Sequence, residues 1–324
     1  MAHYGRDKGW ITYWELWNEP NVRASGYESG LYEIKDFVRL LEVGRAAAQA
    51  ADPNAIIVMG GMSGLTQIDA EYSYDALTYL DEVGKLGGWQ HVDIIALHPY
   101  HPAPPEGHIQ RFDRTVTLQD ELRQLDVLME RYGHKPVWLT ELGWTTSSTP
   151  PGVSEIDQAL YLVRAYLLAL AHPTVEKLFW YDFRNDTDPN APYTRPRYDA
   201  ANYEFHYGLL RRSYPLRASD ASLRKPGFVA FRTMSSMLGG LVPLETRLDG
   251  TGEHAGVYWY AFGGTRRVDV LWRTGEHAPC CVWRVVAQGG SAAVGWQRAL
   301  HSGGGQWHAA GAPRRPWRTV VYRI

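Results

Sequence analysis

In the segment WELWNEPN at residues 14–21, an aromatic and aliphatic run ends in a short polar segment. The apolar part, residues 11–17, predicts a short strand with a buried face. Pro20 cannot donate a backbone hydrogen bond to a sheet, so the strand ends there. The carboxylate of Glu19 is therefore expected at the carboxyl end of this strand.

Four similar runs follow the first at a steady interval. The centres of successive runs lie 38 to 43 residues apart, and nearly every gap holds a segment with helical periodicity. Short strands that alternate with helices indicate βα units and a parallel sheet. The expected strands are residues 11–17, 55–59, 93–97, 136–140 and 176–183, and the clearest helical patterns lie at 37–48, 118–132, 156–170 and 226–238.

The fourth expected strand ends much as the first one does. The stretch VWLTELGW at residues 137–144 puts Glu141 at the carboxyl end of the strand, and Gly143 follows it. Ligands of parallel βα proteins bind at the carboxyl ends of the strands. Two carboxylates there are what cleavage of a glycosidic bond requires, because one must donate a proton while the other stays ionised.

The chain changes character after its glycine pair at residues 239–240. Strand-like runs broken by glycine clusters predict a small antiparallel β-sandwich domain over residues 241–324, after a βα domain over residues 1–240. A long irregular stretch at residues 184–224 precedes the last helix, and loops of this length are usually functional or specific to a family. The expected strands of the second domain are residues 257–262, 268–272, 282–286 and 319–322.

The composition excludes several classes of partner. With 33 basic and 35 acidic side chains the net charge is −2, which argues against nucleic acid or an anionic membrane as the main partner. No apolar run approaches the length of a membrane span, and residues 1–10 carry no apolar signal segment. The adjacent cysteines Cys280 and Cys281 are expected to be free thiols. The compartment stays open: a signal on the natural N-terminus would make the protein secreted or extracytoplasmic.

The two glutamate stretches resemble the acid/base and nucleophile motifs of the retaining glycoside hydrolases of clan A. IALHPY at residues 95–100, YGLL at 207–210 and KP at 225–226 look most like family 39, whose members include β-xylosidases, α-iduronidases and exopolysaccharide hydrolases. The resemblance runs from about Trp10 to the end of the chain. It implies an α/β fold of the (β/α)8 TIM-barrel type followed by a small β domain, and it implies no cofactor.

The resemblance also implies a role for individual residues. Glu19 would be the general acid/base and Glu141 the nucleophile, while Asn18 would hydrogen-bond the 2-hydroxyl of the sugar. His98 and Tyr100, after the third strand, would line the sugar site, with Tyr100 near the nucleophile. The substrate would be a β-linked glycoside, an oligosaccharide or a polysaccharide, cleaved with retention by two carboxylates about 5–5.5 Å apart.

One feature departs from the family pattern. In the clan the Asn-Glu motif closes barrel strand four, so this chain would hold strands four to eight and lack the first three βα units, about 120 residues at its own spacing. A barrel without these units has two open edges and an exposed core. We therefore expect a missing N-terminal segment or an oligomer partner. The alternative to an active enzyme is a catalytically inactive fragment or a carbohydrate-binding remnant.

Several aromatic residues allow two interpretations. Trp144, next to the nucleophile motif, and Trp180, in the fifth strand, could each stack on a sugar ring or belong to the core. Tyr258, Trp259 and Trp272 of the β domain could also bind sugar, but packing is the favoured role.

Five polar residues near the expected strand ends allow a second interpretation. His98 and His101 lie three residues apart, but a strand-to-turn segment does not put both on one face, so we expect no metal site. Glu15 shares a face with the acid/base glutamate by strand alternation, and we expect it to be buried and hydrogen-bonded. Asp182 and Arg184 could contact substrate or pair with each other.

Overall fold

The computed structural model of the protein forms two compact units, Met1–Phe228 and Val229–Ile324. A helix at residues 226–238 spans this division, and the domain boundary expected after residue 240 stays a prediction. The structure describes residues 1–22, 33–64, 74–111, 114–188, 190–192, 197–212 and 223–274, together with the strand backbone at 282–286.

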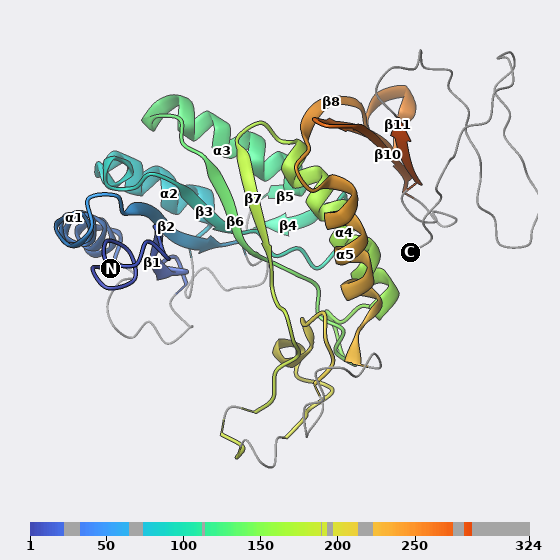
Figure 1. The fold of residues 1–324 in the computed structure, drawn as a ribbon, viewed down its shortest axis with the longest axis horizontal. Helices are drawn as coiled ribbons and strands as arrows, with labels where there is room; N and C mark the ends of the chain where they lie inside the picture. Colours follow the sequence, from blue (N-terminus) through green and yellow to red (C-terminus); the bar gives the residue numbers. More distant parts are fainter. Residues whose placement is uncertain are drawn as a thin grey trace, which may run out of the picture. The chain divides into compact units, whose positions relative to one another are not determined.

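The first unit is built on a five-stranded parallel sheet (Figure 1) in which the strands follow the order β1-β2-β3-β6-β7. All five strands expected from the sequence are present, and their bounds differ from the prediction by a few residues. The strands are β1 (Tyr13–Asn18), β2 (Ile56–Ser63), β3 (Ile95–His98), β6 (Val137–Leu142) and β7 (Val175–Trp180). The expected α/β class with a parallel sheet is therefore confirmed.

The helices of this unit follow the predicted pattern, except that no helix had been predicted at the position of α2. They are α1 (Ile34–Ala51), α2 (Ala76–Lys85), α3 (Leu118–Tyr132) and α4 (Glu155–Ala171), and α5 (Pro226–Leu238) begins at its end. Helix α3 starts with a capping box, in which Thr117 and Asp120 each accept a hydrogen bond from the backbone N–H of the other. None of the helices in the described ranges is long and apolar enough to cross a membrane.

The order of the strands explains where these helices lie. Because the order never reverses, right-handed crossovers carry every connecting helix to the same side of the sheet. Successive helices contact one another, and α1, α2 and α3 lie along one side of the sheet in Figure 1. The opposite face is filled by the strands' own side chains, where Val58, Ile94, Ala96 and Trp138 form a buried cluster.

In the described part of the chain, β1 and β7 are the two edges of this sheet and do not pair with each other. Tyr13 on β1 and Phe179 on β7 are each 44% exposed as a result. Both rings contact Trp138 of the buried cluster, at centroid distances of 4.8 Å and 5.7 Å. The sheet is therefore an open one in the described residues, and the closed barrel stays a prediction.

Some short elements were not expected from the sequence. They are the hairpin strands β4 (Ile109–Arg111) and β5 (Arg114–Val116) and the 3-10 helices η1 (Gly88–His91) and η2 (Tyr203–His206). Elements of three or four residues are too short to show a hydrophobic period, which explains why the pattern did not reveal them.

The second unit contains a four-stranded antiparallel sheet with the order β11-β10-β9-β8. Its elements are β8 (Val242–Asp249), η4 (Gly252–His254), β9 (Val257–Gly263), β10 (Arg267–Arg273) and β11 (Val282–Val286). The antiparallel arrangement is confirmed for these strands, and β8 had not been predicted. The expected strand at residues 319–322 and the two cysteines, Cys280 and Cys281, lie outside the described residues, so the sandwich stays a prediction.

The aromatic residues of this second sheet mostly pack on one another. Tyr258 and Trp272 are 7% and 3% exposed, and their rings stack with centroids 4.9 Å apart. Tyr260 stacks on the same indole at 5.4 Å. The guanidinium of Arg247 lies over the ring of Trp259, 4.6 Å from its centroid. These contacts favour packing over sugar binding for Tyr258 and Trp272.

We predict that Leu125→Ala lowers the free energy of unfolding by about 2–5 kcal/mol, because Leu125 is fully buried on α3 and truncation leaves a cavity. The matched control is Val127→Ala on the same helix, where the side chain is 55% exposed and the change should stay within about 0.5 kcal/mol. Urea unfolding followed by tryptophan fluorescence measures both values. Equal losses in the two variants would contradict the assigned faces of α3.

Candidate active site

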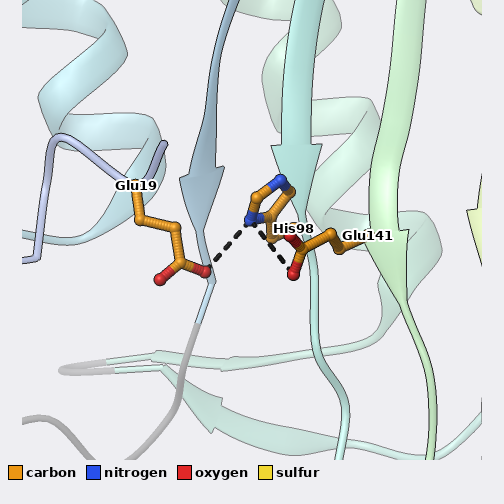
Figure 2. A group of neighbouring side chains, drawn as sticks. All are labelled: Glu19, His98 and Glu141. Carbon is orange, nitrogen blue, oxygen red and sulfur yellow. Dashed lines mark hydrogen bonds and ion pairs between the residues drawn. The ribbon is translucent and has the colours of Figure 1, made fainter. Parts of the chain in front are cut away.

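Three strands bring together two carboxylates and an imidazole. Glu19 follows β1, His98 ends β3 and Glu141 lies near the end of β6. Figure 2 shows the ring of His98 between the two glutamates, with its Nδ1 at 3.0 Å from Oε1 of Glu19 and 3.7 Å from Oε2 of Glu141. One oxygen of each glutamate lies within 4.8 Å of the other. The two acids expected from the sequence therefore meet, although 122 positions separate them in the chain.

An unusual backbone path at the end of β1 sets the position of Glu19. Trp17 and Glu19 have φ angles of +78° and +45°, a left-handed conformation that costs a non-glycine residue about 1–3 kcal/mol. The N–H of Glu19 donates to the carbonyl of Gly61 over 2.9 Å. Asn21 is fully buried, and its amide exchanges hydrogen bonds of 2.8 Å and 2.9 Å with the backbone of Ser63. These hydrogen bonds stabilise the left-handed backbone conformation at the end of β1.

An irregularity in the pairing of β6 turns two consecutive side chains toward the site. In a regular strand, Thr140 and Glu141 would point to opposite faces of the sheet. The register of β6 on β7 shifts just after Leu139, and such bulges re-aim side chains. As a result the hydroxyl of Thr140 lies 3.0 Å from Nε2 of His98, while Glu141 accepts a 2.8 Å hydrogen bond from the hydroxyl of Tyr100.

Tyr100 is fixed at both its backbone and its phenol. Its carbonyl accepts a 2.8 Å hydrogen bond from Arg111, which is 1% exposed and forms an ion pair with Glu121 of α3. Burial raises the pKa of the Tyr100 phenol, and the charge of Glu141 and its hydrogen bond raise it further. Tyr100 therefore remains a hydrogen-bond donor to Glu141. No pattern in the sequence had indicated the part played by Arg111.

Electrostatics favour a protonated His98. The residue is 1% exposed, and this burial lowers the pKa of its imidazole. The hydrogen bond with Glu19 and the charges of Glu141, Glu19 and Glu15 outweigh the burial, so the pKa is raised above its ordinary value. A cationic imidazole here offsets the repulsion between two neighbouring carboxylates.

Glu15 is less buried than the sequence indicated. The residue is exposed, because β1 is an edge strand of the described sheet. Its carboxylate is nevertheless hydrogen-bonded: Oε1 accepts from the N–H of Gly61 over 2.8 Å and from the hydroxyl of Thr140 over 3.2 Å. The expected hydrogen bonding is present, and the expected burial holds only in part, because desolvation still raises the pKa of the Glu15 carboxylate.

The remaining residues expected to contact sugar are Asn18, Trp144 and Trp180. Asn18 ends β1, directly before Glu19, and pairs in register with Gly61. Trp144 is 2% exposed, and its indole N–H donates to the carbonyl of Ala103 over 2.9 Å. Its ring stacks on Trp180, which is partly buried, at a centroid distance of 6.0 Å. This packing favours a structural role for Trp144, and sugar contacts by Asn18 and Trp180 stay predictions.

The long irregular stretch contributes a third carboxylate that the sequence analysis did not identify. Glu204 lies on η2, where burial raises its pKa and the charges of Glu19 and Glu141 add to the effect, while a hydrogen bond with Tyr203 opposes it. The pKa of Tyr203 is raised mainly by burial, and Glu19 contributes to that shift as well. The length of the stretch was the only signal in the sequence that this segment reaches the site.

The loop after β6 holds η2 in place. Thr145 donates to the carbonyl of Tyr203 over 2.6 Å, and the N–H of Thr146 donates to the carbonyl of His206 over 3.1 Å. The ammonium of Lys225, which is 1% exposed, donates to Thr146 and to the same His206 carbonyl, each over 2.9 Å. Burial lowers the pKa of Lys225 to about 8. This lysine joins η2 to the loop beside the acids.

Among the described residues, Glu19, His98 and Glu141 are the one group of three acidic, histidine or cysteine side chains spaced closely enough to hold a cation. Both ring nitrogens of His98 already make hydrogen bonds, one with Glu19 and one with Thr140. His101, the other histidine of the predicted turn, lies outside this group. Its Nδ1 lies 3.3 Å from the carbonyl of Ala103, and burial lowers its pKa to about 4.

Solved structures of glycoside hydrolases resemble this chain. A family 39 glycoside hydrolase from the gut symbiont Bacteroides cellulosilyticus shares 27% identity over 89% of this chain and 52% of its own, with a TM-score of 0.59. A glucosidase from Croceicoccus marinus shares the fold at 15% identity and a TM-score of 0.51, covering 83% of this chain and 50% of its own. The chain resembles clan A glycoside hydrolases and is most like family 39.

This likeness comes from the comparison of structures. Models of known protein families and curated proteins gave no match. The chain spans about half the length of the solved structures that it resembles.

We predict that Asp182→Asn stabilises the protein at pH 8 by about 1–3 kcal/mol and has little effect at pH 4. Burial and the charge of Asp186 raise the pKa of Asp182 to about 7, and Lys225 and Arg184 oppose this only in part. The folded state therefore binds more protons than the unfolded state between about pH 4 and 7, so stability falls as the pH rises through this window.

Urea unfolding at both pH values measures the effect. Asp7→Asn is the control, because the side chain of Asp7 is 48% exposed. A gain for Asp182→Asn that is the same at pH 4 and pH 8 would show that the charge of Asp182 is not its cause.

Proposed function

We propose that this protein is a retaining glycosidase that hydrolyses a β-linked glycoside, an oligosaccharide or a polysaccharide by double displacement. One observation carries the proposal: oxygens of Glu19 and Glu141 lie within 4.8 Å of each other at the ends of two parallel strands. This spacing is nearer to the roughly 5–5.5 Å of retaining glycosidases than to the roughly 6.5–9.5 Å of inverting ones. The likeness to family 39 glycoside hydrolases supports the same reaction.

In the first step, a carboxylate oxygen of Glu141 attacks the anomeric carbon while the glycosidic bond breaks. Glu19 gives its proton to the leaving oxygen, and a glycosyl ester of Glu141 forms. The hydroxyl of Tyr100, 2.8 Å from Oε2 of Glu141, orients the attacking carboxylate. In the second step Glu19 removes a proton from water, the water oxygen attacks the anomeric carbon, and Glu141 leaves as a carboxylate.

We propose further that the five parallel strands are consecutive strands of a (β/α)8 barrel. Their unreversed order and the helices on one side support this proposal, since a doubly wound sheet would reverse its order. The acids then lie at the carboxyl ends of the strands, where TIM-barrel enzymes carry their sites. A carbohydrate-binding remnant without turnover is the alternative, because the exposed edge residues Tyr13 and Phe179 belong to a sheet that is open in the described residues.

We predict that the chain hydrolyses at least one member of a panel of aryl β-glycosides, and that Glu141→Ala lowers kcat roughly a thousandfold or more. The first product, followed by NMR, should keep the β configuration. With added azide, Glu141→Ala should release an α-glycosyl azide by single displacement, and Glu19→Ala a β-glycosyl azide. Glu130→Ala, at an exposed position of α3, is the control and should keep full activity.

Other outcomes identify the rival functions. Sugar binding in calorimetry without any turnover supports the remnant and contradicts the enzyme. Activity that a chelator removes and a divalent cation restores would point to a metal-dependent reaction at the group formed by Glu19, His98 and Glu141. An α-configured first product would refute retention and leave only an inverting hydrolase.

A further inference from the structure

A series of hydrogen bonds links Glu19, the residue directly after β1, to Glu15 on β1. Nδ1 of His98 lies 3.0 Å from Oε1 of Glu19, and Nε2 of the same ring lies 3.0 Å from the hydroxyl of Thr140. Thr140 in turn donates to Oε1 of Glu15 over 3.2 Å. The series thus leaves β1 at Glu15, passes through β6 and β3, and returns to the residue directly after β1.

The direction of these hydrogen bonds fixes the tautomer of His98. A threonine hydroxyl has one proton, and Thr140 gives it to Glu15, so the hydroxyl oxygen can only accept from the imidazole. Nε2 of His98 therefore carries a proton. Nδ1 and Glu19 then share one proton between them: either a cationic His98 donates to a carboxylate, or a protonated Glu19 donates to a neutral ring.

We propose that His98 stores the proton which Glu19 delivers to the leaving oxygen, and that Glu15 and Thr140 are positioning residues which keep Nε2 protonated. The inference rests on the proposed role of Glu19. As the glycosidic bond breaks, one proton passes from Nδ1 to Glu19 and one from Glu19 to the leaving oxygen, which leaves a neutral ring and a carboxylate. The attacking water later gives a proton to Glu19, and Nδ1 recovers it, so no proton is gained or lost.

Close packing surrounds the hydrogen bond between His98 and Thr140. A Cβ atom on Gly61 would lie 2.1 Å from Nε2 of His98 and 2.8 Å from the hydroxyl of Thr140, so no side chain fits beside this contact. The N–H of Gly61 also donates to Glu15 over 2.8 Å and holds the far end of the series. A ring that is 1% exposed exchanges its protons with its partners more readily than with solvent.

Charged groups on the neighbouring elements affect the proton that Nδ1 of His98 shares with Glu19. Burial lowers the pKa of His98, but its hydrogen bond with Glu19 and the surrounding carboxylates raise it above the ordinary value. Partial desolvation raises the pKa of Glu15, while the N–H of Gly61, the charge of His98 and the hydroxyl of Thr140 lower it. The titratable groups that face His98 or its partner Glu19 are Glu15, Glu19, Glu141, Tyr203 and Glu204.

NMR titration of the ¹⁵N-histidine-labelled chain tests the inference, with His98→Gln used to assign the signals. Two-bond ¹H–¹⁵N spectra should show the Nε2–H tautomer of His98 at high pH. Glu15→Gln keeps an acceptor for Thr140 but removes the charge, and should lower the pKa of His98 by about one unit. Thr140→Val should release the tautomer, Thr140→Ser should restore it, and Thr115→Val, at an exposed position, should change neither.

Kinetics supply the second readout. In Glu15→Gln the alkaline limb of kcat/KM should move to lower pH by the same shift as the pKa of His98, and kcat should fall more than KM changes. A merely structural role for Glu15 would lower stability and leave both the titration and the alkaline limb unmoved. Such a result would overturn the inference.

The two readouts separate this inference from the proposed function. A wild-type chain without turnover refutes the glycosidase, whereas the tautomer of His98 still decides whether the proton is held as described. An Nδ1–H tautomer in the wild type, an unchanged His98 titration in Glu15→Gln, or an unchanged tautomer in Thr140→Val would each overturn the inference. Should Glu15→Gln fail to fold, the pair Thr140→Val and Thr140→Ser decides alone.

Discussion

Glu15, Glu19 and the contact between His98 and Thr140 all meet at Gly61, a residue without a side chain. Its N–H donates to Glu15 and its carbonyl accepts from the N–H of Glu19, so its backbone holds both ends of the acidic segment. Any Cβ at this position would collide with His98 and Thr140. The contact of His98 from β3 and Thr140 from β6 with β2 therefore requires glycine at this position, and the placement of His98 beside Glu19 depends on that contact.

Two carboxylates at this distance repel each other, and the site contains what offsets the repulsion. His98 lies between Glu19 and Glu141 and is held there from its far side by Thr140. Tyr100 donates to Glu141 and is itself fixed through its backbone. Groups that are oriented before substrate arrives need no reorganisation during reaction, which is the main source of electrostatic catalysis. The proposed chemistry therefore depends on the buried contacts that orient Glu19 and Glu141 as well as on the two acids themselves.

The segment that carries Glu204 is irregular but not loosely held. Hydrogen bonds from Thr145, Thr146 and the buried Lys225 tie η2 to the loop after β6. A third carboxylate thus acts on the electrostatics of Glu19 and Glu141 from a fixed support. This part of the site is held in place mainly by hydrogen bonds from side-chain donors to its backbone carbonyls, and less by regular secondary structure.

The parallel α/β unit, its five strands and the two glutamates at strand ends could be predicted from the sequence alone, because hydrophobic periodicity and strand breakers act within a few residues. The arrangement of the groups around the acids could not, because it depends on contacts between strands. The shifted register that turns Thr140 toward His98, the exposure of Glu15 on an edge strand and the burial of Trp144 all depend on which strands meet and in what register. Those relations join residues far apart in the chain, and no local pattern records them.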